Sequence, residues 1–180
     1  MRYESNCELG MAVNFLANAK DTKSLLKAYV LEGAIAVHSI IMGISLGALA
    51  DDEATNIKVL MIAYGIHQFL EGVSLGCAIS ATRLSFGKIS GLISFFMCTL
   101  PTGIIVGICI SSSTESQTGI YVEGFANSIA AGILIYVSMV EMLADEFSHD
   151  LVVDNYPLKI KMILLMMIGV GTMALLAVWA

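Results

Sequence analysis

The sequence predicts an all-α protein, a polytopic membrane bundle of five transmembrane helices. Of its 180 residues, 57% are hydrophobic and 13% are charged, which is about half the charged fraction of a soluble domain. The mean hydropathy is +0.84. Five apolar runs reach the length of roughly 20 residues that is needed to cross the hydrocarbon core of a bilayer. Because lipid offers no partner to the open edge of a sheet, each run is expected to be a helix.

The chain is expected to divide into an N-terminal segment, residues 1–27, and a transmembrane domain, residues 28–180. The N-terminal segment carries charges along its whole length and lacks the apolar core of a signal peptide. The five spans are predicted near residues 28–50, 57–80, 89–111, 121–143 and 159–180. Polar loops such as DDEATN and TRLSFGK join them.

The basic residues predict how the helices are oriented in the membrane. Of the nine Lys and Arg residues, only Lys58 falls on the side opposite to the other eight. Basic residues gather on the cytoplasmic side of membrane proteins, so the N-terminus is predicted to be cytoplasmic and the C-terminus extracellular or lumenal. The membrane is either the plasma membrane or that of an organelle. No basic cluster indicates a nucleic-acid partner.

The first two spans contain a repeat. HSIIMGISLG, residues 38–47, and HQFLEGVSLG, residues 67–76, share the pattern H-x-x-x-x-G-x-S-L-G. Adjacent spans cross the membrane in opposite directions, so this is an inverted repeat, an arrangement that often surrounds a mid-membrane substrate site. Each His lies ten residues inside its predicted span, or roughly 15 Å deep. The paired glycines of the repeat are expected to let the two helices approach closely.

The polar side chains of this repeat indicate a metal site. His67 and Glu71 are four residues apart and therefore share a helical face, at the same predicted depth as His38. A buried carboxylate is costly unless it is paired or neutralised, and no Lys or Arg lies near this depth. Imidazole nitrogen and carboxylate oxygen together suit zinc or iron. A hydrogen-bonded His–Glu pair that only packs two helices is the alternative. Three further side chains are candidate contacts: Ser39, Met42 and Gln68.

A second polar group lies at the end of the fourth span, in EMLADEFSHD, residues 141–150. Its candidate metal-binding side chains are Glu141, Asp145, Glu146 and His149. The predicted orientation puts them at the cytoplasmic mouth of the bundle, where they would form an exit site. A solvated acidic helix end is the other interpretation.

These motifs resemble the ZIP family of metal transporters. HSIIMGISLG resembles the fourth helix of that family, HQFLEGVSLG the fifth, TLPTGIIVG the sixth and GILIYVSMVEMLADEF the seventh. The family fold has eight helices, and the five spans of this chain correspond to helices four to eight. The resemblance implies that His38, His67 and Glu71 are primary metal ligands. It also puts Ser39 and Gln68 where some members bind a second metal, whereas Met42 replaces an acidic residue found in some members.

The resemblance implies transport of a divalent cation toward the cytoplasm, zinc first, with iron or manganese as alternatives. No enzymatic activity and no organic cofactor are expected, and the spacing H-x-x-x-E is not the HExxH of a metalloprotease. The partners expected are the lipid bilayer, the metal ion, and either a second copy of the chain or another chain that supplies the missing helices. The alternative function is that of an incomplete, non-transporting metal-binding membrane protein, a sensor or a subunit.

Overall fold

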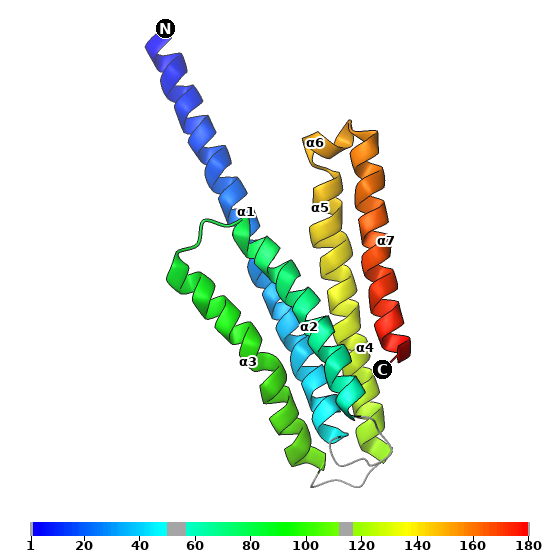
Figure 1. Cartoon of the computed structure of the whole chain (residues 1–180). Coiled ribbons are helices and arrows are strands. Elements are labelled where there is room, and N and C mark those ends of the chain that lie inside the picture. Colours follow the sequence, from blue (N-terminus) through cyan, green and yellow to red (C-terminus); the bar gives the residue numbers. More distant parts are fainter. Residues whose placement is uncertain (1, 50–56, 112–116, 180) are drawn as a thin grey trace.

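The computed structural model describes the backbone of residues 2–49, 57–111 and 117–179. Side chains are described for residues 14–49, 57–110, 124–149 and 152–178. Every regular element in these ranges is a helix, which confirms the predicted fold class. Five helical spans in the described part of the chain are long and apolar enough to cross a membrane. They lie alongside one another as a bundle (Figure 1).

The order of helices follows the predicted order of spans. The elements are α1 (Arg2–Ala48), α2 (Ile57–Ser80), α3 (Phe86–Ser111), α4 (Gln117–Tyr136), the π-helix η1 (Val137–Leu143), α5 (Ala144–Phe147), α6 (Asp150–Val153) and α7 (Tyr156–Trp179). In Figure 1, α1, α3 and α7 run in one direction, and α2 and α4 run in the other. The inverted direction expected for the two repeats is therefore present in α1 and α2.

The first helix extends beyond the first predicted span. Residues 1–27 were expected to be a cytoplasmic segment before that span, and α1 runs without a break through both, from Arg2 to Ala48. Its most apolar part, long enough to cross a membrane, is Asn14–Ala48. The sequence between Gly10 and Gly33 contains no Gly or Pro, so nothing in it interrupts a helix that the following span has already nucleated.

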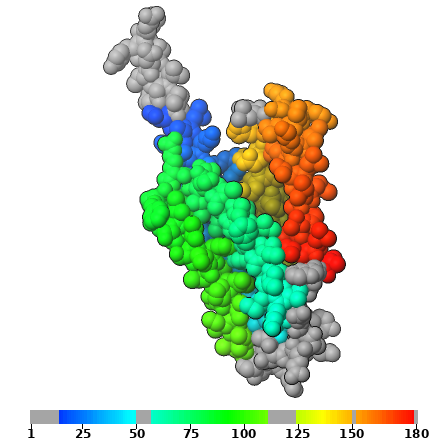
Figure 2. All heavy atoms as spheres, viewed as in Figure 1, coloured from blue at the N-terminus to red at the C-terminus, as the bar shows by residue number. Residues whose placement is uncertain are grey.

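Helix α1 is the centre of the bundle. It packs against α2, α3, α4 and η1, and the buried core is built around it. The core residues are Ala28, Leu31, Ala34, Ile35, Leu75, Ile79, Phe96 and Val137. Figure 2 shows α2 and α3 covering much of α1 on one face. In contrast, α7 has no buried residue among its described side chains, and large apolar residues such as Leu164 and Leu165 are exposed, as expected for a surface in contact with lipid.

Glycines let α1 approach α3, not α2 as the sequence predicted. A Cβ atom added to Gly43 would lie 2.5 Å from the carbonyl oxygen of Leu100 and 2.8 Å from the Cα of Gly103. Gly47 and Gly107 meet the facing backbone in the same way. Of the glycines in the second repeat, Gly72 faces the ring of Phe96 and Gly76 faces open space. The close backbone contact of small residues therefore belongs to the parallel α1–α3 pair.

A π-helical segment, η1, connects α4 to α5. Its sequence VSMVEML includes Val137, which is buried in the core, and Glu141, which is half-buried. One extra residue per turn shifts the helical faces that follow, and such segments often lie at functional positions. The shift precedes Asp145 on α5, which forms ion pairs with Lys23 and Lys27 of α1 at one end of the bundle, here called the open end because a hollow lies beside these three residues.

Candidate metal centre

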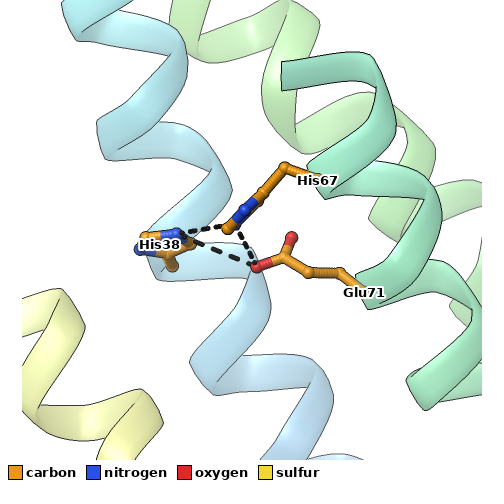
Figure 3. Close-up of side chains that lie close together, drawn as sticks. All are labelled: His38, His67 and Glu71. Atoms are coloured by element: carbon orange, nitrogen blue, oxygen red, sulfur yellow. Dashed lines mark hydrogen bonds and ion pairs between the residues drawn. The ribbon is translucent and has the colours of Figure 1, made fainter. Parts of the chain in front are cut away.

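The central site is formed by three side chains from two antiparallel helices. α1 contributes His38, and α2 contributes His67 and Glu71, which share one face because they are four residues apart. Figure 3 shows the two imidazoles and the carboxylate pointing toward one another. Among the described residues, they form the one group of His, Cys, Asp or Glu side chains able to hold a metal ion together.

The three donor atoms form a small triangle. His38 Nε2 lies 3.4 Å from His67 Nε2 and 3.8 Å from Glu71 Oε1, and His67 Nε2 lies 3.2 Å from Glu71 Oε1. A tetrahedral zinc ion, with bonds of about 2.0–2.1 Å, holds its ligand atoms about 3.3–3.4 Å apart. The triangle therefore has nearly the dimensions of one face of a zinc coordination tetrahedron. The fourth corner would remain open for water or for another ligand.

The site is sheltered but not closed. The side chain of Glu71 is 10% exposed, that of His38 15% and that of His67 28%. The Nδ1 atom of His38 is buried without a hydrogen-bond partner in the described part of the chain, so this ring engages the cluster through Nε2. His67 is the most open member, which makes its side of the triangle the more accessible one.

Ser39 lies on the far side of the Glu71 carboxylate, and Gln68 contacts Ser39. The Ser39 hydroxyl lies 3.4 Å from Glu71 Oε2 and 3.3 Å from Gln68 Oε1, in position to donate to either oxygen. Oε1 of Glu71 therefore faces the imidazoles while Oε2 faces Ser39. This arrangement orients the carboxylate toward the histidines, as groups behind metal ligands commonly do. Met42, one turn beyond His38 on α1, is half-buried.

The second predicted group, at the end of the fourth span, is arranged differently. Asp145 forms ion pairs with both Lys23 and Lys27 of α1, so its two oxygens already have cationic partners. Glu141 lines a hollow beside these three residues. Glu146 and His149 are exposed. The structure thus places the four predicted residues near one end of the bundle, but it does not bring their donor atoms together into a cluster like the central one.

One buried acidic residue was missed by sequence reasoning. Glu32 of α1 is 4% exposed, and neither of its carboxylate oxygens has a hydrogen-bond partner among the described residues. The available signal was a single carboxylate inside an apolar run, YVLEGAIAV, within the first predicted span. It lies outside the H-x-x-x-x-G-x-S-L-G repeat, so the repeat did not draw attention to it.

The fold and this site together define a polytopic membrane protein with a candidate divalent-metal centre between two antiparallel helices. The family model described as ZIP Zinc transporter matches residues 16–177. The chain therefore belongs to the ZIP family, as its motifs predicted. No solved structure matches it.

Curated relatives support the same assignment. The chain is 44% identical to Zinc transporter 8 of Oryza sativa subsp. japonica over 153 residues, covering 84% of this chain and 39% of the relative. It is 41% identical to Zinc transporter 3 of Arabidopsis thaliana over 155 residues, covering 85% and 45%. It is 34% identical to Fe(2+) transport protein 3, chloroplastic, of Arabidopsis thaliana over 160 residues, covering 88% and 37%. The chain thus spans less than half the length of these relatives.

Proposed function

We propose that this chain forms the ion-binding part of a divalent-metal transporter, with zinc as the cargo. The observation that carries the proposal is the triangle of His38 Nε2, His67 Nε2 and Glu71 Oε1, whose sides of 3.2–3.8 Å fit the face of a zinc tetrahedron. The triangle lies between two helices of membrane-spanning length. An ion held there is sheltered between α1 and α2, with its more accessible side at His67.

The donor set explains both binding and release. Two neutral imidazoles and one carboxylate leave a bound divalent ion with a net charge of +1, which is less costly inside a membrane than the free ion. Three protein ligands leave an exchangeable position through which the ion can leave. Nitrogen and oxygen donors also accept iron and manganese, and the names of the relatives include both zinc and Fe(2+) transport. Zinc remains the first expectation, with iron and manganese as alternatives.

Ser39 and Gln68 are proposed to position Glu71 rather than to form a complete second metal site. The Ser39 hydroxyl contacts both the Gln68 amide oxygen and the Oε2 atom of Glu71. Met42, which is half-buried one turn beyond His38, supplies a soft thioether beside the site at most. One ion at the three primary ligands is therefore the expected stoichiometry of the central site.

The direction and surroundings of transport are also proposals. The distribution of Lys and Arg favours a cytoplasmic N-terminus, and uptake toward the cytoplasm then moves the ion toward the end of the bundle that holds Lys23, Lys27 and Asp145. A second copy or a partner chain that supplies further helices would complete the family's eight-helix arrangement. Protease accessibility of a cleavable tag at each end of the chain, measured on intact cells, tests the orientation; cleavage of the N-terminal tag would reverse it.

Replacement of Glu71 by Gln tests the site most directly. The change preserves the shape of the side chain and removes its charge. If the cluster only packs two helices, the substitution is tolerated and can stabilise the protein, because a buried charge is lost. If it binds metal, zinc affinity of the purified chain falls by more than about 100-fold, beyond the 10- to 100-fold typical of supporting groups. A Glu71→Gln variant that folds and binds zinc like the parent overturns the proposal.

Zinc flux separates the two candidate functions of the chain. A transporter moves zinc into liposomes or cells that contain it, whereas a sensor or subunit binds zinc without moving it. The informative comparison is the chain alone against the same chain joined to the three N-terminal helices of a longer relative. If only the joined protein moves zinc, this chain by itself binds the ion but does not transport it.

A further inference from the structure

The buried acid Glu32 is not used by the central site. It lies on α1, six residues before His38, and is 4% exposed. Ala28 and Ala36, one turn to either side, are 1% and 5% exposed, so Glu32 belongs to a continuously buried face of α1. Both of its oxygens lack a hydrogen-bond partner among the described residues.

No protein cation is placed to neutralise this carboxylate in the described part of the chain. The nearest basic residue along α1 is Lys27, which is about 140° around the helix from Glu32, and its ammonium contacts Asp145. On α3, the close pairs Gly43–Gly103 and Gly47–Gly107 set a parallel register. The same register, extended toward the N-terminal ends of both helices, places Glu32 at the level of Leu92. Leu92 is apolar and packs against the core. An ionised carboxylate in such a place is strongly unfavourable, so the group is either protonated or in contact with a mobile cation.

Glu32 lies between the two polar regions along α1. Ser39, which contacts Glu71 at the central site, is seven residues further along α1. Seven residues make almost two full turns, so both side chains share a face about 10 Å apart. In the other direction, Lys27 at the open end is five residues away. Of the described acidic residues of α1, Glu32 is the one between the central cluster and that end.

We propose that Glu32 is a transfer ligand for the transported divalent cation, an oxygen donor that the ion meets between the central site and the Lys23–Lys27–Asp145 end. A single carboxylate binds a divalent ion too weakly to retain it, but it lowers the cost of moving that ion through an apolar passage. It therefore changes how fast the ion leaves more than how tightly it is held. This inference rests on the proposed function, because it needs an ion at His38, His67 and Glu71.

The test measures equilibrium affinity and exchange rate separately. The purified chain is loaded with zinc in detergent, and release to an excess of a water-soluble chelator is followed by stopped flow. We expect Glu32→Gln to slow release by about tenfold while leaving equilibrium zinc affinity within about twofold of the parent. Glu32→Asp retains the charge and is expected to recover part of the rate. The matched control is Asp154→Asn, an exposed acid-to-amide change beyond α6 that should alter neither quantity.

The outcomes distinguish this inference from the proposed function. Slower release in Glu32→Gln at unchanged affinity, with partial recovery in Glu32→Asp, supports the transfer role. Release at the parental rate from a folded Glu32→Gln variant overturns it, because a buried acid that only packs the helix does not control exchange. A parent chain that binds no zinc, or whose zinc binding is unaffected by His67→Ala, overturns the proposed function and the transfer role together.

Discussion

The two polar regions of this bundle use the same acidic group in opposite ways. At the centre, the carboxylate of Glu71 faces two imidazoles, His38 and His67. At the open end, the carboxylate of Asp145 faces two ammonium groups, those of Lys23 and Lys27. Imidazole has a lone pair to offer a metal when it is neutral, whereas an ammonium group has only protons to donate. The first arrangement therefore leaves a place for a cation, and the second already contains its own.

The number of acidic residues in a segment does not by itself predict where a metal site lies. The segment EMLADEFSHD contains four acids and a His, more metal-binding side chains than the two His and one Glu of the centre. The centre nevertheless has the compact donor triangle. What differs is the neighbouring helix: α1 presents His38 to one region and Lys23 and Lys27 to the other. Partner chemistry, more than the number of carboxylates, decides which region is suited to hold a metal.

The largest expected effect is the loss of zinc affinity when a ligand of the central site is substituted, compared with a substitution at the open end. His38→Ala or His67→Ala removes one of three primary donors, so zinc affinity is expected to fall by more than about 100-fold. Asp145→Asn removes an acid whose partners are lysines and is expected to leave affinity at the central site within about twofold. Isothermal titration of the purified variants measures both. An equal loss of zinc affinity in the His→Ala and Asp145→Asn variants would mean that the two regions form one site.

Acidification is expected to weaken the central site next most strongly. An imidazole must be neutral to bind a metal, and its ordinary pKa is about 6.5. As pH falls, protons compete with the metal for imidazole ligands, so affinity decreases rather than increases. Zinc titrations from pH 7.5 to pH 5.5 check this; a flat profile would exclude the histidines as ligands.

A smaller effect, on stability, is expected from the close packing of α1 against α3. Gly103→Ala forces a methyl group against the backbone of α1 at Gly43, and overpacking of this kind is expected to destabilise the protein by about 1–3 kcal/mol. Gly65→Ala is the matched control, because a Cβ there meets open space, and it is expected to be neutral or slightly stabilising. Thermal unfolding in detergent compares the two. Equal unfolding temperatures for the two variants would show that the close contact between α1 and α3 does not contribute to the stability of the protein.

The smallest effect is expected from the lysines at the open end. Lys23 is 62% exposed and Asp145 is 36% exposed, so water screens this ion pair. Lys23→Ala is expected to change the free energy of unfolding by less than about 1 kcal/mol. Lys27, at 16% exposure, is expected to matter more than Lys23. Thermal unfolding of the two single variants ranks them, and a larger loss for Lys23→Ala would reverse this assignment.

The sequence by itself determined the features that depend on local spacing and composition. Long apolar runs must become helices in lipid, so the fold class followed directly. Spacing of four residues is enough to place His67 and Glu71 on one face of a helix. The repeated H-x-x-x-x-G-x-S-L-G frame on adjacent, oppositely directed spans also predicted that His38 would lie at their depth, and the 3.4 Å contact between the imidazoles agrees with this.

Tertiary structure decided which faces meet, because that choice depends on packing between segments far apart in the chain. Gly43 was expected to allow close contact between α1 and α2, but it packs against α3. Asp145 meets Lys27 across 118 residues of sequence, and no local pattern predicts that pair. Glu32 looks like an isolated charge in the sequence. Only the packing of α1 at the centre of the bundle buries its carboxylate without a partner among the described residues, since burial is a property of all the helices around a residue.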